Sequence, residues 1–182
     1  MGKKGNNKQY VFKAELFEEK DSSLMWYFRI EVPHHIVKDV CTEKNKRVLC
    51  LFNGTISSQV PVLSAGEKKF YITINKEIRQ KLKVKTGDIL TISISRDESE
   101  YGIETPDFFN EFCNQDTEGS DFFHKLTPGK QRTLLYLINK PKSENKKIEK
   151  AMIVFDYLKN TGGKLDFKAL NESMKNNRFN QT

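Results

Sequence analysis

The segment Trp26-Tyr-Phe-Arg-Ile-Glu-Val-Pro33 is followed 42 residues later by a related segment, Lys68-Lys-Phe-Tyr-Ile-Thr-Ile74. Working outward from this start, eight apolar residues align with eight others at the same offset. The aligned pairs are Phe28 with Phe70, Ile30 with Ile72, Val32 with Ile74, Ile36 with Ile78, Val40 with Leu82, Val48 with Leu90, Cys50 with Ile92 and Phe52 with Ile94. A unit of this kind cannot cover its own apolar face, so the repeat predicts two related halves that pack together.

Each half has the pattern of a strand, a short helix, a turn and a second strand. The expected elements are strands at 24–32, 47–53, 68–74 and 89–95, a helical segment at 33–40, and a helix from an Asn75 cap to Leu82. Two further strands, at 10–17 and 55–63, would complete a small barrel around a pseudo-two-fold axis. The alternative is that the two halves are ordinary strand pairs within one sheet.

Four segments of this region form a recognisable set. They are Phe12-Lys-Ala-Glu-Leu16, Trp26-Tyr-Phe-Arg-Ile-Glu-Val-Pro33, Arg47-Val-Leu-Cys-Leu-Phe-Asn-Gly54 and Lys83-Val-Lys-Thr-Gly-Asp-Ile-Leu-Thr-Ile-Ser-Ile94. Together they resemble the bacterial DUF1905 domain, over residues 10–97. The resemblance implies a double-split β-barrel, related to the swapped-hairpin barrels of the AbrB and MazE transcription factors. It also implies a structural turn, in which Gly87 has a left-handed or tight backbone and Asp88 hydrogen-bonds the turn.

The residues after the barrel carry helix signals. Thr105-Pro106 predicts a helix start, and Phe108, Phe109 and Phe112 follow it at helical spacing. A polar loop is expected at 114–119. Further helices are expected at 120–126, from Thr127-Pro128 to Lys140, from a Ser143 cap to Lys159, and from an Asp166 cap to Met174. The apolar stripe of the longest helix is Ile148, Ala151, Met152, Phe155 and Leu158.

Two stretches of this helical part are Phe122-Phe-His-Lys-Leu-Thr-Pro-Gly-Lys-Gln-Arg-Thr-Leu-Leu-Tyr-Leu-Ile138 and Lys146-Lys-Ile-Glu-Lys150. They resemble the YdeI/OmpD-associated helical domain, over residues 104–165, which implies an association with bacteriocin protection or envelope stress. The chain departs from that family at Leu137, where Trp is usual, and at 143–148, where an Arg run is replaced by lysines. Lys offers an anion a point charge where Arg offers a two-pronged donor.

These patterns divide the chain into a disordered tail at 1–9, a barrel at 10–97, a helical domain at 104–174 and a frayed tail at 175–182. The expected fold class is a β-barrel plus α: a double-split barrel of two pseudo-repeated halves, followed by a small helical domain. Because both half-barrels lie in one chain, a monomer is expected rather than an obligate dimer. No run approaches the roughly 18 apolar residues of a membrane span, and the N-terminus lacks a secretory signal. A cytoplasmic location is therefore expected.

The 182 residues include 31 Lys and Arg against 24 Asp and Glu, a net charge of +7. Such a balance favours anionic partners such as nucleic acid. Only six of the cations are Arg, however, and the excess is spread along the chain. The candidate anion-binding residues come from the densest group and are Lys142, Lys146, Lys147 and Lys150. The alternative is that these lysines form an ordinary solvated helix face.

The sequence contains none of the glycine-rich, serine or histidine motifs that mark common enzyme sites. The three cysteines lack redox spacing, and the three histidines have no carboxylate or Cys at ligand spacing. No metal and no cofactor is expected. The weaker alternatives are His34 or His35 as an acid–base group, and Trp26 or Tyr27 as a stacking platform for bases.

The expected function is that of a non-enzymatic cytoplasmic protein that binds a protein or small-molecule partner. The resemblance of the helical part implies a role in stress or bacteriocin tolerance. One alternative is a nucleic-acid-binding regulator, which the basic charge and the AbrB-like barrel favour. A third is a small-molecule-binding or enzymatic cleft between the barrel and the helices, for which no residue set is nominated.

Overall fold

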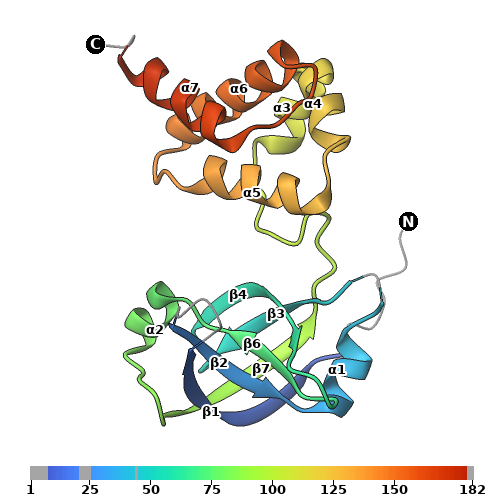
Figure 1. The fold of residues 1–182 in the computed structure, drawn as a ribbon, viewed down its shortest axis with the longest axis vertical. Coiled ribbons are helices and arrows are strands. Elements are labelled where there is room, and N and C mark those ends of the chain that lie inside the picture. The colour runs from blue at the N-terminus through green and yellow to red at the C-terminus, as the bar shows by residue number, and fades with distance from the viewer. Residues whose placement is uncertain (1–7, 21–25, 44, 180–182) are drawn as a thin grey trace. The chain divides into compact units, whose positions relative to one another are not determined.

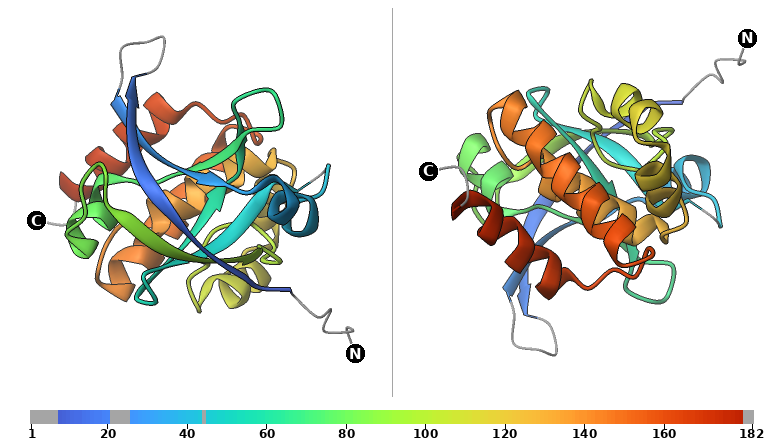
Figure 2. Two further views of the ribbon diagram at one scale, coloured as in Figure 1. Left: turned by 90° about the horizontal axis from the view of Figure 1, so that it is seen from below. Right: turned by 90° about the horizontal axis from the view of Figure 1, so that it is seen from above.

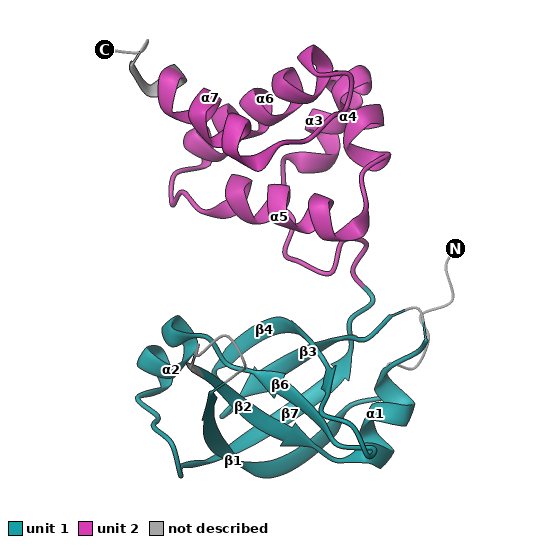
Figure 3. Ribbon diagram, in the orientation of Figure 1, with its two compact units in different colours: residues 1–98 teal, residues 99–182 magenta. Residues whose placement is uncertain are grey.

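Two separate hydrophobic cores, one among strands and one among helices, organise the chain. The computed structural model describes residues 8–20, 26–43 and 45–179. The chain divides into two compact units, Met1–Glu98 and Ser99–Thr182 (Figure 3). Most of the tail expected at 1–9, and the last residues of the tail expected at 175–182, lie outside the described residues.

The first unit is built on a curled antiparallel sheet with the strand order β4-β3-β7-β1-β2-β6-β5 (Figure 1). Its strands are β1 (Tyr10–Lys20), β2 (Trp26–Val32), β3 (Arg47–Phe52), β4 (Ile56–Pro61), β5 (Leu63–Ser64), β6 (Phe70–Thr73) and β7 (Ile89–Arg96). Two short helices, α1 (His34–Val40) and α2 (Lys76–Leu82), lie at opposite ends of this sheet (Figure 1; Figure 2, left). The expected class, a β-barrel combined with α-helices, is confirmed at this level.

The apolar residues of the repeat form the core of this unit, because all eight aligned pairs are buried in it or pack against it. In β7, for example, Leu90, Ile92 and Ile94 are fully buried, while the residues between them are partly exposed. Successive side chains of a strand point to opposite faces, so this pattern turns one face of the strand inward. β1 pairs with β7 through Tyr10–Glu15 and with β2 from Leu16 onward, and it thereby joins the two sides of the sheet.

The two halves repeat one another in their strand pairing. α1 and α2 begin and end 42 residues apart, and Ile30 is paired directly with its own repeat partner, Ile72. The first part of β1 follows the same pattern. Its residues Tyr10–Glu15 pair with β7 in the same way that β4, Ile56–Pro61, pairs with β3. Beyond these segments β1 continues along β2, and β5 continues along β6. The unit therefore contains two halves with matching connections.

Gly87 and Asp88 form the turn that leads into β7. Gly87 has a φ of +90°, a conformation that residues with a Cβ disfavour. Oδ2 of Asp88 accepts a hydrogen bond from the N–H of Lys85 at 2.8 Å. The same turn holds β1, because the N–H of Gly87 donates to the carbonyl of Leu16 and the N–H of Leu16 donates to that of Asp88, both at 2.9 Å. In this structure the two residues shape a turn and attach it to a strand.

The second unit is a set of helices around an aromatic core. Its helices are α3 (Phe109–Gln115), α4 (Thr117–His124), α5 (Pro128–Asn139), α6 (Glu144–Asn160) and α7 (Phe167–Phe179). α6 packs against α4, α5 and α7, and it lies beside α7 in Figure 2 (right). Phe109, Phe123 and Phe155 are fully buried, and Phe109 meets both other rings edge to face. This arrangement is favourable because a positive ring edge meets a negative ring face.

The first two helices of this unit begin elsewhere than expected. The Thr105-Pro106 start is wrong: α3 begins at Phe109, and the hydroxyl of Thr105 donates to the carbonyl of Ile103 instead of accepting from a helix N–H. Asp116, expected in a loop, caps α4, and its Oδ1 accepts from the N–H of Gly119 at 2.9 Å. A carboxylate at this position satisfies a helix N–H that has no partner within the helix.

α6 buries a different stripe from the one expected. Met152 is 53% exposed, so its assignment to the apolar stripe is wrong. The fully buried residues at helical spacing are Ala151, Val154, Phe155 and Leu158. The face of α6 that packs against the core is therefore rotated away from Met152. The last helix also differs from the expectation, because α7 extends to Phe179, beyond the end expected at Met174.

The helix caps provide a test of the observed boundaries. Oδ1 of Asn75 accepts from the N–H of Ile78 at 2.8 Å, whereas Ser143 makes no side-chain cap bond at the start of α6, contrary to expectation. We expect Asn75→Ala to lower the free energy of unfolding of the barrel unit by about 1 kcal/mol. We expect Ser143→Ala to change that of the helical unit by less than about 0.5 kcal/mol. Urea unfolding followed by far-UV circular dichroism measures both, and equal losses would contradict the assigned caps.

Candidate ligand-binding pocket

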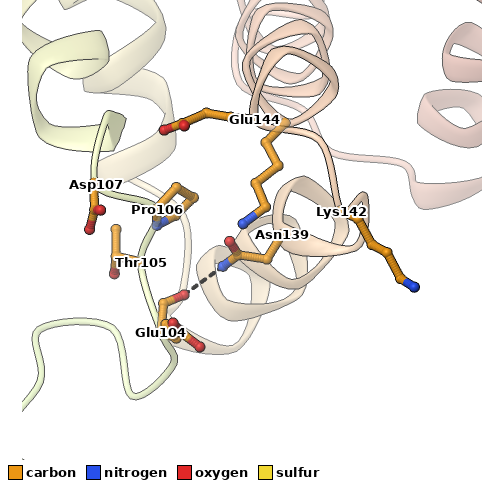
Figure 4. Close-up of a pocket in the computed structure, with 8 residues that line it drawn as sticks. Glu104, Thr105, Pro106, Asp107, Asn139, Lys142 and Glu144 are labelled. Atoms are coloured by element: carbon orange, nitrogen blue, oxygen red, sulfur yellow. Dashed lines mark hydrogen bonds between the residues drawn. The ribbon is translucent and has the colours of Figure 1, made fainter.

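Two of the four candidate anion-binding lysines, Lys142 and Lys147, line a polar hollow of about 220 Å³ in the helical unit. In Figure 4 the side chain of Lys142 extends away from Asn139, whose Nδ2 donates to the carbonyl of Glu104 at 2.6 Å. Three carboxylates line the same hollow, those of Glu104, Asp107 and Glu144. Because carboxylates outnumber ammonium groups here, the hollow does not favour an anion.

The other two lysines lie elsewhere on α6. Lys146 is exposed, whereas Lys150 is half-buried and its Nζ donates to the carbonyl of Leu137 at 3.1 Å. Leu137 belongs to the last turn of α5, where carbonyls lack helix partners and a cation is favourable. Lys150 therefore stabilises the end of α5, and the structure does not bring the four lysines together at one place.

A Tyr–His pair in the helical unit is engaged in structural hydrogen bonds. The hydroxyl of Tyr101 lies 2.8 Å from Nε2 of His124, and Nδ1 of His124 lies 2.7 Å from the carbonyl oxygen of Ser120. A carbonyl only accepts, so Nδ1 carries the proton and Nε2 accepts from the hydroxyl. Burial raises the pKa of Tyr101 to about 12, which keeps this donor protonated. Both ring nitrogens are thus occupied in holding α4.

Metal binding and membrane insertion find no support among the described residues. Within 8–20, 26–43 and 45–179, no group of three or more His, Cys, Asp or Glu side chains could hold a metal ion. In the same part of the chain, no helix combines the length and the apolar character needed to cross a bilayer. The three cysteines are free thiols.

A larger, mainly apolar pocket of about 460 Å³ lies in the barrel unit, beside α1, the segment before β3 and the β5–β6 pair. His34, Val37, Lys38 and Cys41 line it from α1 and the residue that follows, and their i, i+3, i+4, i+7 spacing puts them on one helix face. The other lining residues are Thr42, Glu43, Lys46, Val62, Leu63, Ser64 and Phe70. One face of a short helix and one edge of the sheet thus enclose the pocket.

The internal repeat explains why this pocket is open. At the offset of 42, Val37 of α1 corresponds to Arg79 of α2, and Phe28 of β2 corresponds to Phe70 of β6. The guanidinium of Arg79 lies 3.3 Å from the ring centroid of Phe28 and covers that ring. Val37 is too short to cover Phe70 in the same way. The ring of Phe70 is instead stacked with His34, with centroids 5.6 Å apart and planes inclined by 11°.

Two titratable groups in this pocket are uncharged near pH 7. Burial lowers the pKa of His34, and the charge of Lys38 lowers it further. Burial raises the pKa of the Cys41 thiol. The pocket therefore presents a neutral imidazole, with one donor and one acceptor, and a protonated thiol. The side chains of Lys38 and Lys46 are exposed at its rim.

The fold and the pocket define a small β-barrel domain with a ligand-sized hollow beside its first helix. A protein-family model described as Domain of unknown function (DUF1905) matches residues 12–94. A DUF1905 domain is thus found in this chain, as the sequence patterns predict, and the matched range contains the whole lining of the pocket. No match was found among curated proteins or among solved structures.

Among the pocket residues, the sequence patterns nominate only His34 for a functional role, as an acid–base group, whereas Phe70 is predicted only as an apolar residue of the repeat. The signal that points to the pocket is the alignment of the two short helices, where Val37 stands opposite Arg79. A difference in side-chain size at one aligned position predicts that the space beside one short helix is filled and the equivalent space beside the other is not. It does not by itself show which residues of the sheet complete the wall.

Proposed function

We propose that this chain is a non-enzymatic, cytoplasmic binding protein whose barrel unit holds a small apolar molecule in the pocket beside α1. The observation that carries the proposal is the hollow of about 460 Å³ with its mainly apolar walls. Ligand pockets commonly have volumes of roughly 300–1,000 Å³, apolar walls and a few polar groups that orient the ligand. His34 and Cys41 supply such polar groups in this pocket.

We further propose that the barrel is a double-split barrel related to those of AbrB and MazE, which the matching strand pairing of its halves supports. The resemblance of the helical unit to the YdeI/OmpD-associated domain supports a role in stress or bacteriocin tolerance, exerted by binding. A nucleic-acid-binding regulator is the alternative. It is less favoured because Lys150 is engaged by α5, and Lys142 and Lys147 lie among carboxylates.

Binding of the neutral fluorescent probe N-phenyl-1-naphthylamine to the full chain tests the pocket. The emission of this probe rises when it leaves water for an apolar site, so a titration yields a Kd. In Val37→Arg, α1 receives the residue type with which α2 covers the ring of Phe28. We expect the probe to bind at least about tenfold more weakly, a change equivalent to about 1.4 kcal/mol. Unchanged affinity in a folded variant would contradict the proposed pocket.

A second pair of variants keeps the test valid if Val37→Arg does not fold. Ser64→Trp narrows the pocket from an exposed lining position, and Ser57→Trp adds the same side chain to an exposed position of β4 outside the lining. We expect the first to weaken binding of the probe and the second to leave it unchanged. Far-UV circular dichroism and the Tm show whether each variant is folded.

A further inference from the structure

We infer that the pocket beside α1 selects anionic amphiphiles: compact molecules with an apolar body and one carboxylate, sulfonate or phosphate group. The apolar body would contact Val37, Val62 and Phe70, and the acidic group would be held at the rim by Lys38 and Lys46. This inference rests on the proposed function, because it names the ligand class of the same pocket.

Lys38 and Lys46 reach the pocket from different elements. Lys38 lies in α1 and Lys46 lies in the segment just before β3, and both are exposed. Within the described part of the chain, neither forms an ion pair. Lys8, Lys81 and Lys159, by contrast, each contact a carboxylate at 2.7–2.9 Å. Two ammonium groups that pair with no carboxylate of the described residues thus border one apolar space.

The acidic residues near the pocket do not cancel these charges. Glu43 is exposed, and it is the only carboxylate among the described residues that line the pocket. Asp39 neighbours Lys38 in α1, but its carboxylate accepts from Nζ of Lys8 at 2.9 Å and from the hydroxyl of Tyr10. The lining itself therefore carries two positive charges and one negative charge.

The positive charges near the pocket act on the pKa values of two groups that line it. In addition to burial, the charges of Lys38 and Lys68 lower the pKa of His34. At Cys41 burial raises the pKa, and the charge of Lys46 acts in the opposite direction. Cations thus act at both ends of the helix face that lines the pocket. The same cations would attract an anion that enters the pocket. The apolar walls strengthen this attraction because they lower the effective dielectric constant.

Two dyes that share one aromatic skeleton separate apolar binding from charge selection. N-phenyl-1-naphthylamine is neutral, and 8-anilino-1-naphthalenesulfonate carries one additional sulfonate. We expect the sulfonate dye to bind the full chain about tenfold more tightly at low salt, because lysines give an anion charge-assisted hydrogen bonds. We expect this advantage to shrink as salt screens the exposed ammonium groups. In the double variant Lys38→Gln/Lys46→Gln, the two affinities should become equal.

The control removes the same two charges elsewhere on the barrel unit. Lys13 and Lys76 are exposed and lie outside the lining, so Lys13→Gln/Lys76→Gln should retain the preference for the sulfonate dye. Ser64→Trp should weaken both dyes, which would locate them in the pocket. The affinity of the neutral dye should be the same in the two double variants and the unmodified chain.

The outcomes distinguish this inference from the proposed function. If neither dye binds, the proposed function itself fails. If the neutral dye binds but the sulfonate dye binds no more tightly, the ligand class is wrong while the apolar pocket stands. The ligand class is also wrong if both double variants lose the preference equally. Dye binding that weakens as the protein concentration rises would indicate that a second copy of the chain covers the pocket, and would overturn both proposals.

Discussion

Ile72→Ala is expected to lower the free energy of unfolding of the barrel unit by about 2–5 kcal/mol. Ile72 is fully buried in β6 and is paired directly with Ile30 of β2, which is also fully buried. Removal of the side chain leaves a cavity, because the surrounding strands are tied to one another by backbone hydrogen bonds and collapse only in part. The loss therefore includes the transfer free energy of the missing atoms and the contacts left unmade around them.

Ile89→Ala is the matched control for this substitution. It removes the same atoms from a strand residue of β7 that is 70% exposed, so we expect a change within about 0.5 kcal/mol. Urea unfolding of the full chain, followed by fluorescence, measures both variants. The single Trp, Trp26, belongs to β2 and so reports on the unit that carries both substitutions. Equal losses would mean that the inner and outer faces of the strands are wrongly assigned.

Gly119→Ala is expected to lower the free energy of unfolding of the helical unit by about 1–3 kcal/mol, through overpacking between α4 and α6. A Cβ at this position would lie 2.5 Å from Cδ2 and 2.7 Å from Cβ of Phe155. The Cβ of Phe155 is attached to the backbone of α6, and its ring is held by Phe109, Phe112 and Phe123. Neither atom can move aside alone, so the two helices must separate.

Gly129→Ala makes the same change where there is space. Gly129 lies in α5, and a Cβ placed there meets no atom within 4 Å. Because Ala favours a helix over Gly by up to about 1 kcal/mol, we expect this variant to be unchanged or slightly more stable. Urea unfolding followed at 222 nm compares the two variants. A similar effect at both positions would show that the close approach of α4 to α6 is not what requires Gly119.

Much of the barrel was predictable from local sequence. Alternating apolar residues in β7 predicted its buried face, and the offset of 42 predicted two helices, which the structure has at His34–Val40 and Lys76–Leu82. Burial of one face imposes a period of two on a strand and of 3.6 on a helix, and both periods are visible along the chain. Caps were less predictable: Asn75 forms its cap bond and Ser143 does not, because the bond requires a particular side-chain rotamer as well as a suitable residue.

By itself, the sequence determined which residues of each half face the core and where the short helices lie between the strands. Only the tertiary structure decided that α1 and the β5–β6 edge leave a pocket, because the fold brings His34, Lys46 and Ser64 to the lining of one hollow. It also decided the roles of the lysines. Lys150 reaches a helix carbonyl, whereas Lys46 borders an apolar space. Hydrogen bonds and charge interactions act over a few ångströms of space, and distance along the chain does not reveal which groups come that close.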